Sequence, residues 1–203
     1  MKIYLVRHGQ TDGNLALRLQ SDKSDLTEEG LRQASVAAAT LAPLHPTHLV
    51  SSTMLRALET ARVIGNVCNL VPETEEVFRE IGRPDRMNGQ LLMNASSFWF
   101  YTLWYLGLTK NEQGSESYKQ VRERVIAAQT YLEALPKEAR VVVVTHSVFI
   151  IFFVAHLCDR RPMGPIRALA ALYRISRIKN GSITPIHLNH NAAKGQCRFR
   201  VEN

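Results

Sequence analysis

The chain has 203 residues, 45% of them hydrophobic, and a formal net charge of +7 at pH 7. These values predict one domain, 1–203, with a full hydrophobic core. The longest apolar run, 148–155, is far shorter than the roughly 18 residues that indicate a membrane span. An apolar strand opens the chain, and no charged segment followed by an apolar one precedes it, so we expect a cytoplasmic protein.

The positive surplus lies in the last part of the chain, because residues 159–203 contain nine Lys or Arg and two acids. Such a patch can attract phosphorylated substrates, bind nucleic acid or guard a sheet edge. No motif that reads RNA or DNA surrounds these residues, and nucleic acid is therefore not an expected partner.

The three cysteines, Cys68, Cys158 and Cys197, are widely spaced and form no CxxC pair. This spacing favours neither a disulfide framework nor a zinc site. We therefore predict that all three are thiols in the core.

The first predicted element is a short strand over Ile3–Val6, an apolar run typical of a strand buried on both faces of a parallel sheet. The strand ends in Arg7, His8 and Gly9. These residues provide a positive fork, an imidazole and a close backbone approach, which are the requirements of an anion site at a strand end.

Strands and helices alternate after this point. We expect a loop over 10–25, a helix from the N-cap Thr27 to about 44, and a strand over 48–50. Ser51, Ser52 and Thr53 are candidate N-caps for a helix from 55 to about 67, which has Arg56 in its first turn. Arg56 therefore also lies close to a strand end.

The second half begins with an aromatic segment, 96–108, that does not fit the alternation and is predicted to be a helical insertion at about 84–114. It could form a lid, a dimer contact or only packing. The later elements are a helix from the capping box at 117 to about 135, a strand over 140–145, a buried helix over 148–158, and strands over 172–178 and 183–188 around the hairpin signal Asn180-Gly181.

Three predicted strand ends carry charged or imidazole side chains: Arg7 and His8 after the first, Arg56 beyond the second, and His146 after the valine-rich strand. The carboxyl ends of parallel strands meet at one sheet edge. Two arginines and two histidines there can bind a tetrahedral dianion without a metal.

A neutral His8 with one ring nitrogen held by a hydrogen bond can attack phosphorus, while the arginines stabilise the transferring charge. The leaving oxygen then needs a proton. Glu80, at the start of the insertion, is the candidate general acid. Each residue alone also has an ordinary structural explanation, and their joint placement on separate strand ends is what favours function.

Several motifs resemble the histidine phosphatase superfamily in its phosphoglycerate-mutase-like branch. They are LVRHGQT at 5–11, LTEEGLRQA at 26–34, SSTMLRALETA at 51–61, FREI around Glu80 and VVVVTHS at 141–147. The resemblance follows the order of the family's motifs over nearly the whole chain. It implies a three-layer α/β/α sandwich with a mainly parallel central sheet.

The resemblance also implies roles. His8 would be the phosphorylated nucleophile, Arg7, Arg56 and His146 would bind the phosphoryl group, and Glu80 would be the general acid and then the base. No metal or organic cofactor is expected. The substrate-binding positions would be Arg7, Asn14, Gln20, Ser21, Arg56 and Ser147.

The chain also departs from the family pattern. Ser147 stands where glycine is usual, and the loop Gln20-Ser21-Asp22 replaces a glycine-containing version. The segment after Glu80, IGRPDRMNG, differs from that of many relatives.

The leading functional hypothesis is a metal-independent phosphomonoester hydrolase, a histidine acid-type phosphatase, that acts through a phosphohistidine on a small phosphorylated metabolite. One alternative is a phosphoglycerate mutase, although FREIGRP does not match the NERHYG-type segment of the longer cofactor-dependent mutases. The other alternative is a protein that binds phosphoryl groups without turnover.

Overall fold

The computed structural model of the chain describes residues 1–92, 94–109, 112–159, 161–175, 177–193 and 196–202. Its central feature is a six-stranded sheet with the order β3-β2-β4-β1-β5-β6. Neighbouring strands are parallel from β3 to β1 and antiparallel from β1 to β6. The strands are β1 (Lys2–Arg7), β2 (His48–Ser51), β3 (Glu73–Thr74), β4 (Arg140–Thr145), β5 (Ile183–Leu188) and β6 (Phe199–Val201).

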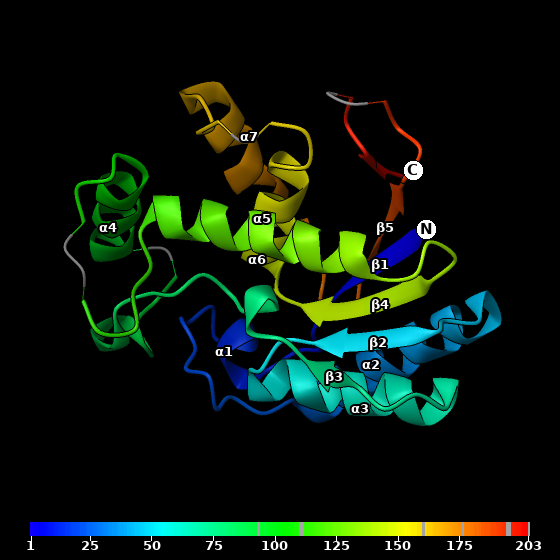
Figure 1. Ribbon diagram of the computed structural model, residues 1–203. Coiled ribbons are helices and arrows are strands. Elements are labelled where there is room, and N and C mark those ends of the chain that lie inside the picture. Colours follow the sequence, from blue (N-terminus) through cyan, green and yellow to red (C-terminus); the bar gives the residue numbers. More distant parts are fainter. Residues whose placement is uncertain (93, 110–111, 160, 176, 194–195, 203) are drawn as a thin grey trace.

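Helices cover both faces of this sheet, as Figure 1 shows. Helices α2 (Glu28–Leu41) and α3 (Leu55–Cys68) pack on one face, and α5 (Tyr118–Ala134) and α6 (Ser147–Ala155) on the other. The predicted α/β/α sandwich is therefore confirmed. The remaining elements are α1 (Asp12–Leu15), α4 (Ala95–Tyr105), α7 (Pro165–Ile175) and the short 3-10 turns η1 (Ala42–Leu44), η2 (Glu76–Phe78) and η3 (Asp85–Met87).

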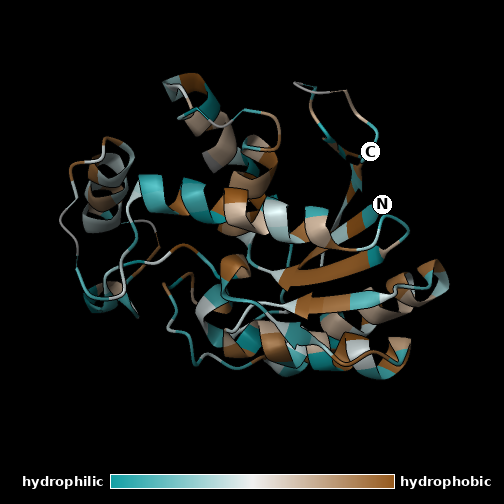
Figure 2. Ribbon diagram, viewed as in Figure 1, coloured by the Kyte–Doolittle hydropathy of each residue, from teal (hydrophilic) through white to brown (hydrophobic). Residues whose placement is uncertain are grey.

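The four valines of β4 explain why this strand lies at the centre. Val141 and Val143 point into the core beneath α5 and α6, whereas Val142 and Val144 point into the core beneath α2 and α3. All four are fully buried, and each contributes about 1.5–3 kcal/mol of hydrophobic stabilisation. An uninterrupted apolar run is what a strand covered on both sides requires, and β2 and β4 stand out as hydrophobic in Figure 2.

Two local predictions about helix ends have different outcomes. The side chain of Thr27 accepts a hydrogen bond from the backbone N–H of Gly30, so Thr27 is the N-cap of α2 as predicted. The predicted capping of α3 by Ser51, Ser52 or Thr53 is wrong, because its N-cap is Met54. The Ser52 hydroxyl instead forms a hydrogen bond with Nε2 of His146.

The predicted strand over 172–178 is also wrong, because α7 extends to Ile175. The sequence from Pro165 has a helical repeat of apolar residues, and this repeat continues through Leu172 and Tyr173. Asn180-Gly181 forms a turn in which Gly181 has a φ of +72°, and this turn connects α7 to β5. The hairpin of this region is β5–β6.

The prediction that all three cysteines are thiols in the core is also wrong. Cys158, just beyond α6, and Cys197, just before β6, form a disulfide across a separation of 39 residues. They are therefore not core thiols. Cys68 at the end of α3 is a free, half-buried thiol.

The aromatic helix α4 packs on the body of the protein through only part of its surface. The indole N–H of Trp104 donates to the carbonyl of Glu116 (2.6 Å), and its ring packs edge-on against Tyr118 and Phe152. Phe98 and Trp99 point outward and are 71% and 61% exposed. Packing therefore accounts for Trp104 but not for the outer face of α4.

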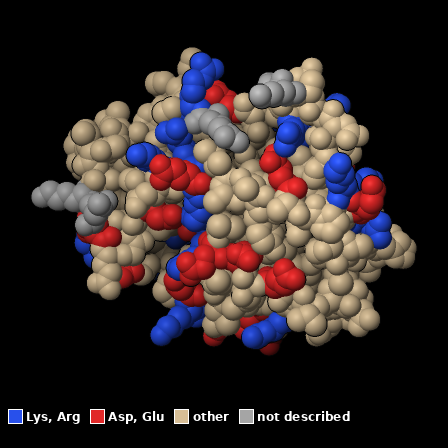
Figure 3. Space-filling view, in the orientation of Figure 1, with Lys and Arg blue, Asp and Glu red and all other residues tan. Residues whose placement is uncertain are grey.

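No helix in the described part of the chain is long and apolar enough to cross a membrane. On the face shown in Figure 3, Lys and Arg side chains are interspersed with Asp and Glu side chains. This mixture is not the single-sign stripe that marks a nucleic-acid footprint.

Candidate active site

The candidate site lies at the carboxyl ends of β2, β4 and β1, three neighbouring parallel strands. The backbone N–H of His8 donates to the carbonyl of Thr145 (2.9 Å), and that of Ser52 donates to the carbonyl of Val144 (2.9 Å). These bonds extend the sheet by one step. They bring the His8 and His146 rings to a centroid separation of 5.1 Å.

His8 is held in one tautomer. Its Nδ1 lies 2.7 Å from the carbonyl oxygen of Gly9, and because a carbonyl only accepts, Nδ1 must carry the hydrogen. Burial lowers the pKa of His8 well below its ordinary value, and the charges of Arg56 and Arg7 lower it further. The ring is therefore neutral near pH 7, and its Nε2 has a free electron pair.

Gly9 fixes the position of this histidine because no other residue fits there. A Cβ on Gly9 would lie 2.3 Å from the backbone oxygen of Gly30 in α2. The N–H of Gly9 donates to the hydroxyl of Thr60 (3.0 Å), which in turn donates to the carbonyl of Arg56 (2.7 Å). The loop after β1 is thus clamped between α2 and α3.

Arg56, which is buried, and Arg7, which is half-buried, supply two positive charges. Arg7 donates to the carbonyl of Ile178, and Arg56 donates to the carbonyl of Ser21 (2.9 Å). Burial lowers the pKa of Arg56 to about 10, although the carboxylate of Glu80 opposes this shift. Both side chains keep a positive charge at neutral pH and are bonded to carbonyl groups, which leaves their charge available to an anion.

His146 is completely buried, and its Nε2 lies 2.8 Å from the hydroxyl of Ser52. Burial lowers the pKa of His146 well below its ordinary value, followed by the charges of Arg56 and other neighbours. The opposite nitrogen, Nδ1, has no hydrogen-bond partner among the described residues. His146 is therefore a second neutral imidazole with one polar atom available to a ligand.

Glu80 lies at the amino end of α6, 7% exposed. Its Oε1 accepts from the backbone N–H groups of Ile81 (3.1 Å) and Phe149 (2.9 Å), and its Oε2 accepts one longer bond from Val148 (3.3 Å). The carboxylate thus occupies the position of a helix cap, next to the residues that follow β4. Oε2 is the less constrained of its two oxygens.

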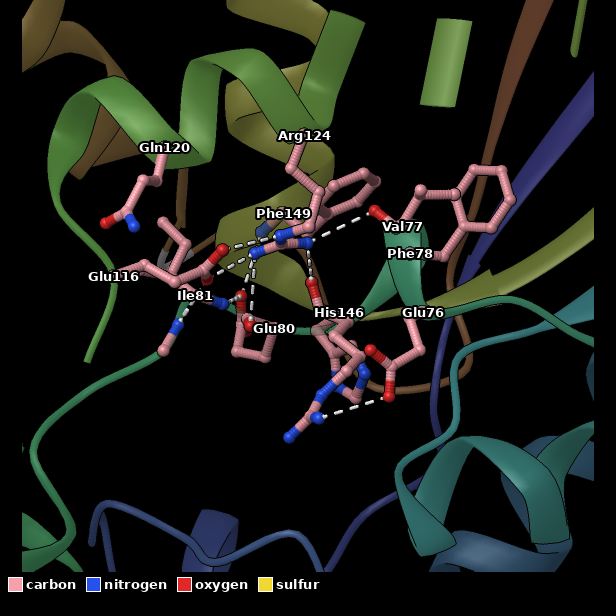
Figure 4. Close-up of polar contacts among 12 residues, drawn as sticks. Glu76, Val77, Phe78, Glu80, Ile81, Glu116, Gln120, Arg124, His146 and Phe149 are labelled. Atoms are coloured by element: carbon pink, nitrogen blue, oxygen red, sulfur yellow. Dashed lines mark hydrogen bonds and ion pairs between the residues drawn. The ribbon is translucent and has the colours of Figure 1, made fainter. Parts of the chain in front are cut away.

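A half-buried ion pair that the sequence analysis missed holds the Glu80 segment in place. Arg124 of α5 donates from Nε (2.8 Å) and Nη2 (2.7 Å) to the two carboxylate oxygens of Glu116. It also donates to the carbonyls of Val77, Arg79 and Glu80, at 3.1, 2.7 and 3.3 Å. Figure 4 shows Arg124 between Glu116 and the turn that ends in Glu80. The position of Glu116 directly before the capping box was the available signal.

The other predicted substrate-binding residues play mainly supporting roles in this structure. Asn14 caps α1 with Thr11, and its Oδ1 accepts from Asn180 Nδ2 (3.0 Å), which also donates to the carbonyl of His8 (3.1 Å). Gln20 lies 2.6 Å from the Thr11 hydroxyl.

The remaining two positions differ from each other. Ser21 contributes its carbonyl to Arg56, while its side chain is exposed. Ser147 is the first residue of α6 and is 9% exposed. Of these four, Ser147 is the residue placed directly beside His146.

The polar atoms of the site suit an anion. In the described part of the chain, Arg7 Nε, Arg56 Nε and His146 Nδ1 are buried without a hydrogen-bond partner. Buried polar atoms are rarely left in this state, and a phosphoryl group carries the oxygens that would satisfy them. No three His, Cys, Asp or Glu side chains of the described residues are grouped as metal ligands.

Comparisons with known proteins agree with this geometry. The family model described as the histidine phosphatase superfamily (branch 1) matches residues 3–194. A probable phosphoglycerate mutase GpmB from Proteus mirabilis is 30% identical over 151 residues, 73% of this chain and 70% of that protein. The Yersinia pestis protein of the same name is 40% identical over 82 residues, 40% of this chain and 38% of that protein.

Among solved structures, the chain is similar to a mycobacterial glucosyl-3-phosphoglycerate phosphatase in complex with VO3. The TM-score is 0.76 at 25% identity, and the match covers 100% of this chain and 97% of that one. The similarity therefore includes the whole sandwich.

Proposed function

Because the chain belongs to branch 1 of the histidine phosphatase superfamily, we propose that it is a phosphomonoester hydrolase that forms a phosphohistidine on His8. Its substrate would be a small phosphorylated metabolite. The observation that carries this proposal is the tautomer of His8, whose Nδ1 is held by the Gly9 carbonyl. An imidazole fixed in this way presents Nε2 as a nucleophile.

In the first step, Nε2 of His8 attacks phosphorus, and the bond between phosphorus and the ester oxygen breaks. Arg7, Arg56 and His146 hold the non-bridging oxygens and stabilise their charge. Protonated Glu80 gives its proton to the leaving alcohol. Oε2 is the oxygen suited to this transfer, because it accepts only one long backbone hydrogen bond.

In the second step, water attacks the phosphorus of the phosphohistidine. The Glu80 carboxylate takes a proton from this water, the bond between nitrogen and phosphorus breaks, and the electron pair returns to Nε2 of His8. Inorganic phosphate leaves, and Glu80 is again protonated for the next cycle. Because its pKa is low, the released His8 ring is again a neutral nucleophile at the end of the cycle.

A direct test is trapping of the intermediate. The protein is mixed with a ³²P-labelled phosphomonoester and quenched in alkaline denaturant, and the label is mapped by mass spectrometry. We expect label on His8 and its complete loss in His8→Ala, together with loss of p-nitrophenyl phosphate hydrolysis. The control is His45→Asn, at an exposed histidine with a left-handed backbone. Wild-type activity in His8→Ala would refute the mechanism.

A phosphoglycerate mutase is the second candidate, supported by the name of the Proteus mirabilis relative. Such an enzyme also forms a phosphohistidine, but it returns the phosphoryl group to an alcohol instead of to water. Interconversion of 2- and 3-phosphoglycerate that is faster than phosphate release would establish this alternative. Phosphate binding with neither reaction would instead indicate a non-catalytic binding protein.

We propose the cytoplasm as the compartment of the protein. Cytosolic reductants keep most thiols reduced, so the Cys158–Cys197 pair would there be a dithiol. Cells are quenched in acid to stop thiol exchange, the free thiols are then alkylated in denaturant at neutral pH, and mass spectrometry measures the state of the pair. A stable disulfide in the cell would contradict a cytoplasmic location.

A further inference from the structure

Arg83 is a half-buried arginine that the reaction scheme does not use. It follows Glu80 by three residues, and its Nη1 lies 3.5 Å from the phenol oxygen of Tyr101 on α4. Burial is the largest cause that lowers the pKa values of Arg56 and His146, and the charge of Arg83 is among the causes that lower them further. Arg83 therefore adds a third positive charge to the surroundings of the phosphoryl-binding residues.

The backbone at this point is fixed. The N–H of Gly82 donates to the Glu116 carboxylate (2.8 Å), and the N–H of Glu116 donates back to the carbonyl of Gly82 (3.1 Å). A Cβ on Gly82 would lie 2.7 Å from the carbonyl oxygen of Gly114. The position of Arg83 beside Glu80 is thus set by packing.

The charge of Arg83 is not neutralised by a bound carboxylate. Burial lowers the pKa of Arg83, but Tyr101, Glu80 and Asp22 raise it, and the net shift is upward. Asp22 forms its ion pair with Arg79, and Glu80 accepts from the amino end of α6. Arg83 itself forms no ion pair with any residue that the structure describes.

We infer that Arg83 and Tyr101 bind a second anionic group on the leaving-group side of the substrate, an inference that rests on the proposed function. Arg7 and Arg56 already match the two negative charges of one phosphoryl group. In the proposed mechanism Glu80 contacts the leaving oxygen, so Arg83, three residues further along the chain, would contact the rest of the leaving alcohol. A guanidinium fork beside a phenol binds a carboxylate or a second phosphate. The preferred substrates are therefore phosphomonoesters whose alcohol carries a negative charge.

Matched substrate pairs test this inference. The carboxylate pair is 3-phosphoglycerate against glycerol 3-phosphate, and the phosphate pair is fructose 1,6-bisphosphate against fructose 6-phosphate. We expect kcat/KM to be about tenfold or more higher for the more negative member of at least one pair, the effect of one charge-assisted hydrogen bond. The pair that shows the preference identifies the anion.

Variants assign the preference to Arg83. In Arg83→Gln the ratio of kcat/KM within the preferred pair should fall to near one, and Arg83→Lys should keep part of it because the charge remains without the fork. The control is Arg86→Gln, at a neighbouring arginine paired with Glu112 (2.6 Å) on the surface, which should keep the wild-type ratio. Thermal unfolding of each variant checks that it is folded.

The outcomes separate the two proposals. If phosphohistidine forms and p-nitrophenyl phosphate is hydrolysed, but the wild type does not discriminate within either pair, the inference is wrong and the proposed function stands. Arg83→Gln and Arg83→Lys variants that slow both members of the preferred pair equally would also overturn it. If no phosphohistidine forms and no ester is hydrolysed, both proposals fail.

Discussion

Replacing Arg124 by methionine should destabilise the protein and impair proton transfer to the leaving group. The side chain is 14% exposed and its partner Glu116 is 25% exposed. Burial works to raise the pKa of Glu116, but the hydrogen bonds and charge of Arg124 outweigh it and keep this pKa below its usual value. Methionine would remove the donors of Arg124 from three backbone carbonyls and from the Glu116 carboxylate, which would keep the N–H of Gly82 (2.8 Å).

The loss of one partner from a buried ion pair costs about 3–5 kcal/mol, and the partial exposure of this pair places the expectation at about 3 kcal/mol. For a chain of this size, that corresponds to a fall in Tm of about 6–12 °C. Lys119→Met is the matched control, since Lys119 lies on the same helix and its side chain is 80% exposed. The control should stay within about 0.5 kcal/mol of the wild type.

The kinetic readout separates positioning from mere stability. If Arg124 positions Glu80, the variant should lose about tenfold or more in kcat with glycerol 3-phosphate, whose alkoxide needs a proton. It should lose much less with p-nitrophenyl phosphate, whose leaving group needs little protonation. Urea unfolding and both rates are measured below the Tm of the variant. Equal losses with both substrates, or an unchanged Tm, would refute the reasoning.

Three further predictions concern the proposed nucleophile His8 and its surroundings. His8 and His146 have lowered pKa values in the folded protein, so the unfolded chain binds more protons below pH 6.5. Urea unfolding should therefore show that stability decreases as the pH is lowered, by up to about 1.4 kcal/mol per pH unit for each ring. A flat profile from pH 7 to 5 would contradict this. Gly9→Ala places a Cβ 2.3 Å from a backbone oxygen and should cost about 1–3 kcal/mol and most of the activity, whereas Gly164→Ala, with open space around it, should cost neither. Ser52→Ala removes the hydrogen-bond partner of His146 Nε2, which should destabilise the protein by about 1–2 kcal/mol and lower kcat. An unchanged kcat would show that this bond does not orient the ring.

Much of the fold is predictable because its strongest signals are local. The valine run of β4 and the apolar run of β1 predict doubly covered strands, and Thr27 and Ser117 predict helix starts that the structure confirms. The edge strands β3 and β6 have two and three residues, too few for a period to be read. The Cys158–Cys197 bond depends on the return of the chain through β5 and β6, which no local spacing encodes.

The residues of the candidate site were also predictable only in part. Arg7, His8 and His146 follow strands that the sequence predicts, so parallel pairing alone brings them to one edge, and Arg56 follows from its position near a strand end. Arg83 and Arg124 were missed because their importance depends on contacts from other elements, with Tyr101 on α4 and with Glu116 before α5. In the sequence, each is an ordinary arginine in a charged stretch.

The strand order also has a consequence for synthesis on the ribosome. Strand β1, which is made before the other strands of the sheet, lies between β4 and β5, and the backbone nitrogen of Met1 donates a hydrogen bond to a carbonyl 187 residues away. At roughly 5–20 residues per second, this apolar strand, which directly precedes the proposed nucleophile His8, waits on the order of 10 s for its first neighbour in the sheet. We expect nascent chains released before β4 to aggregate through this strand, and activity to arise only late in translation.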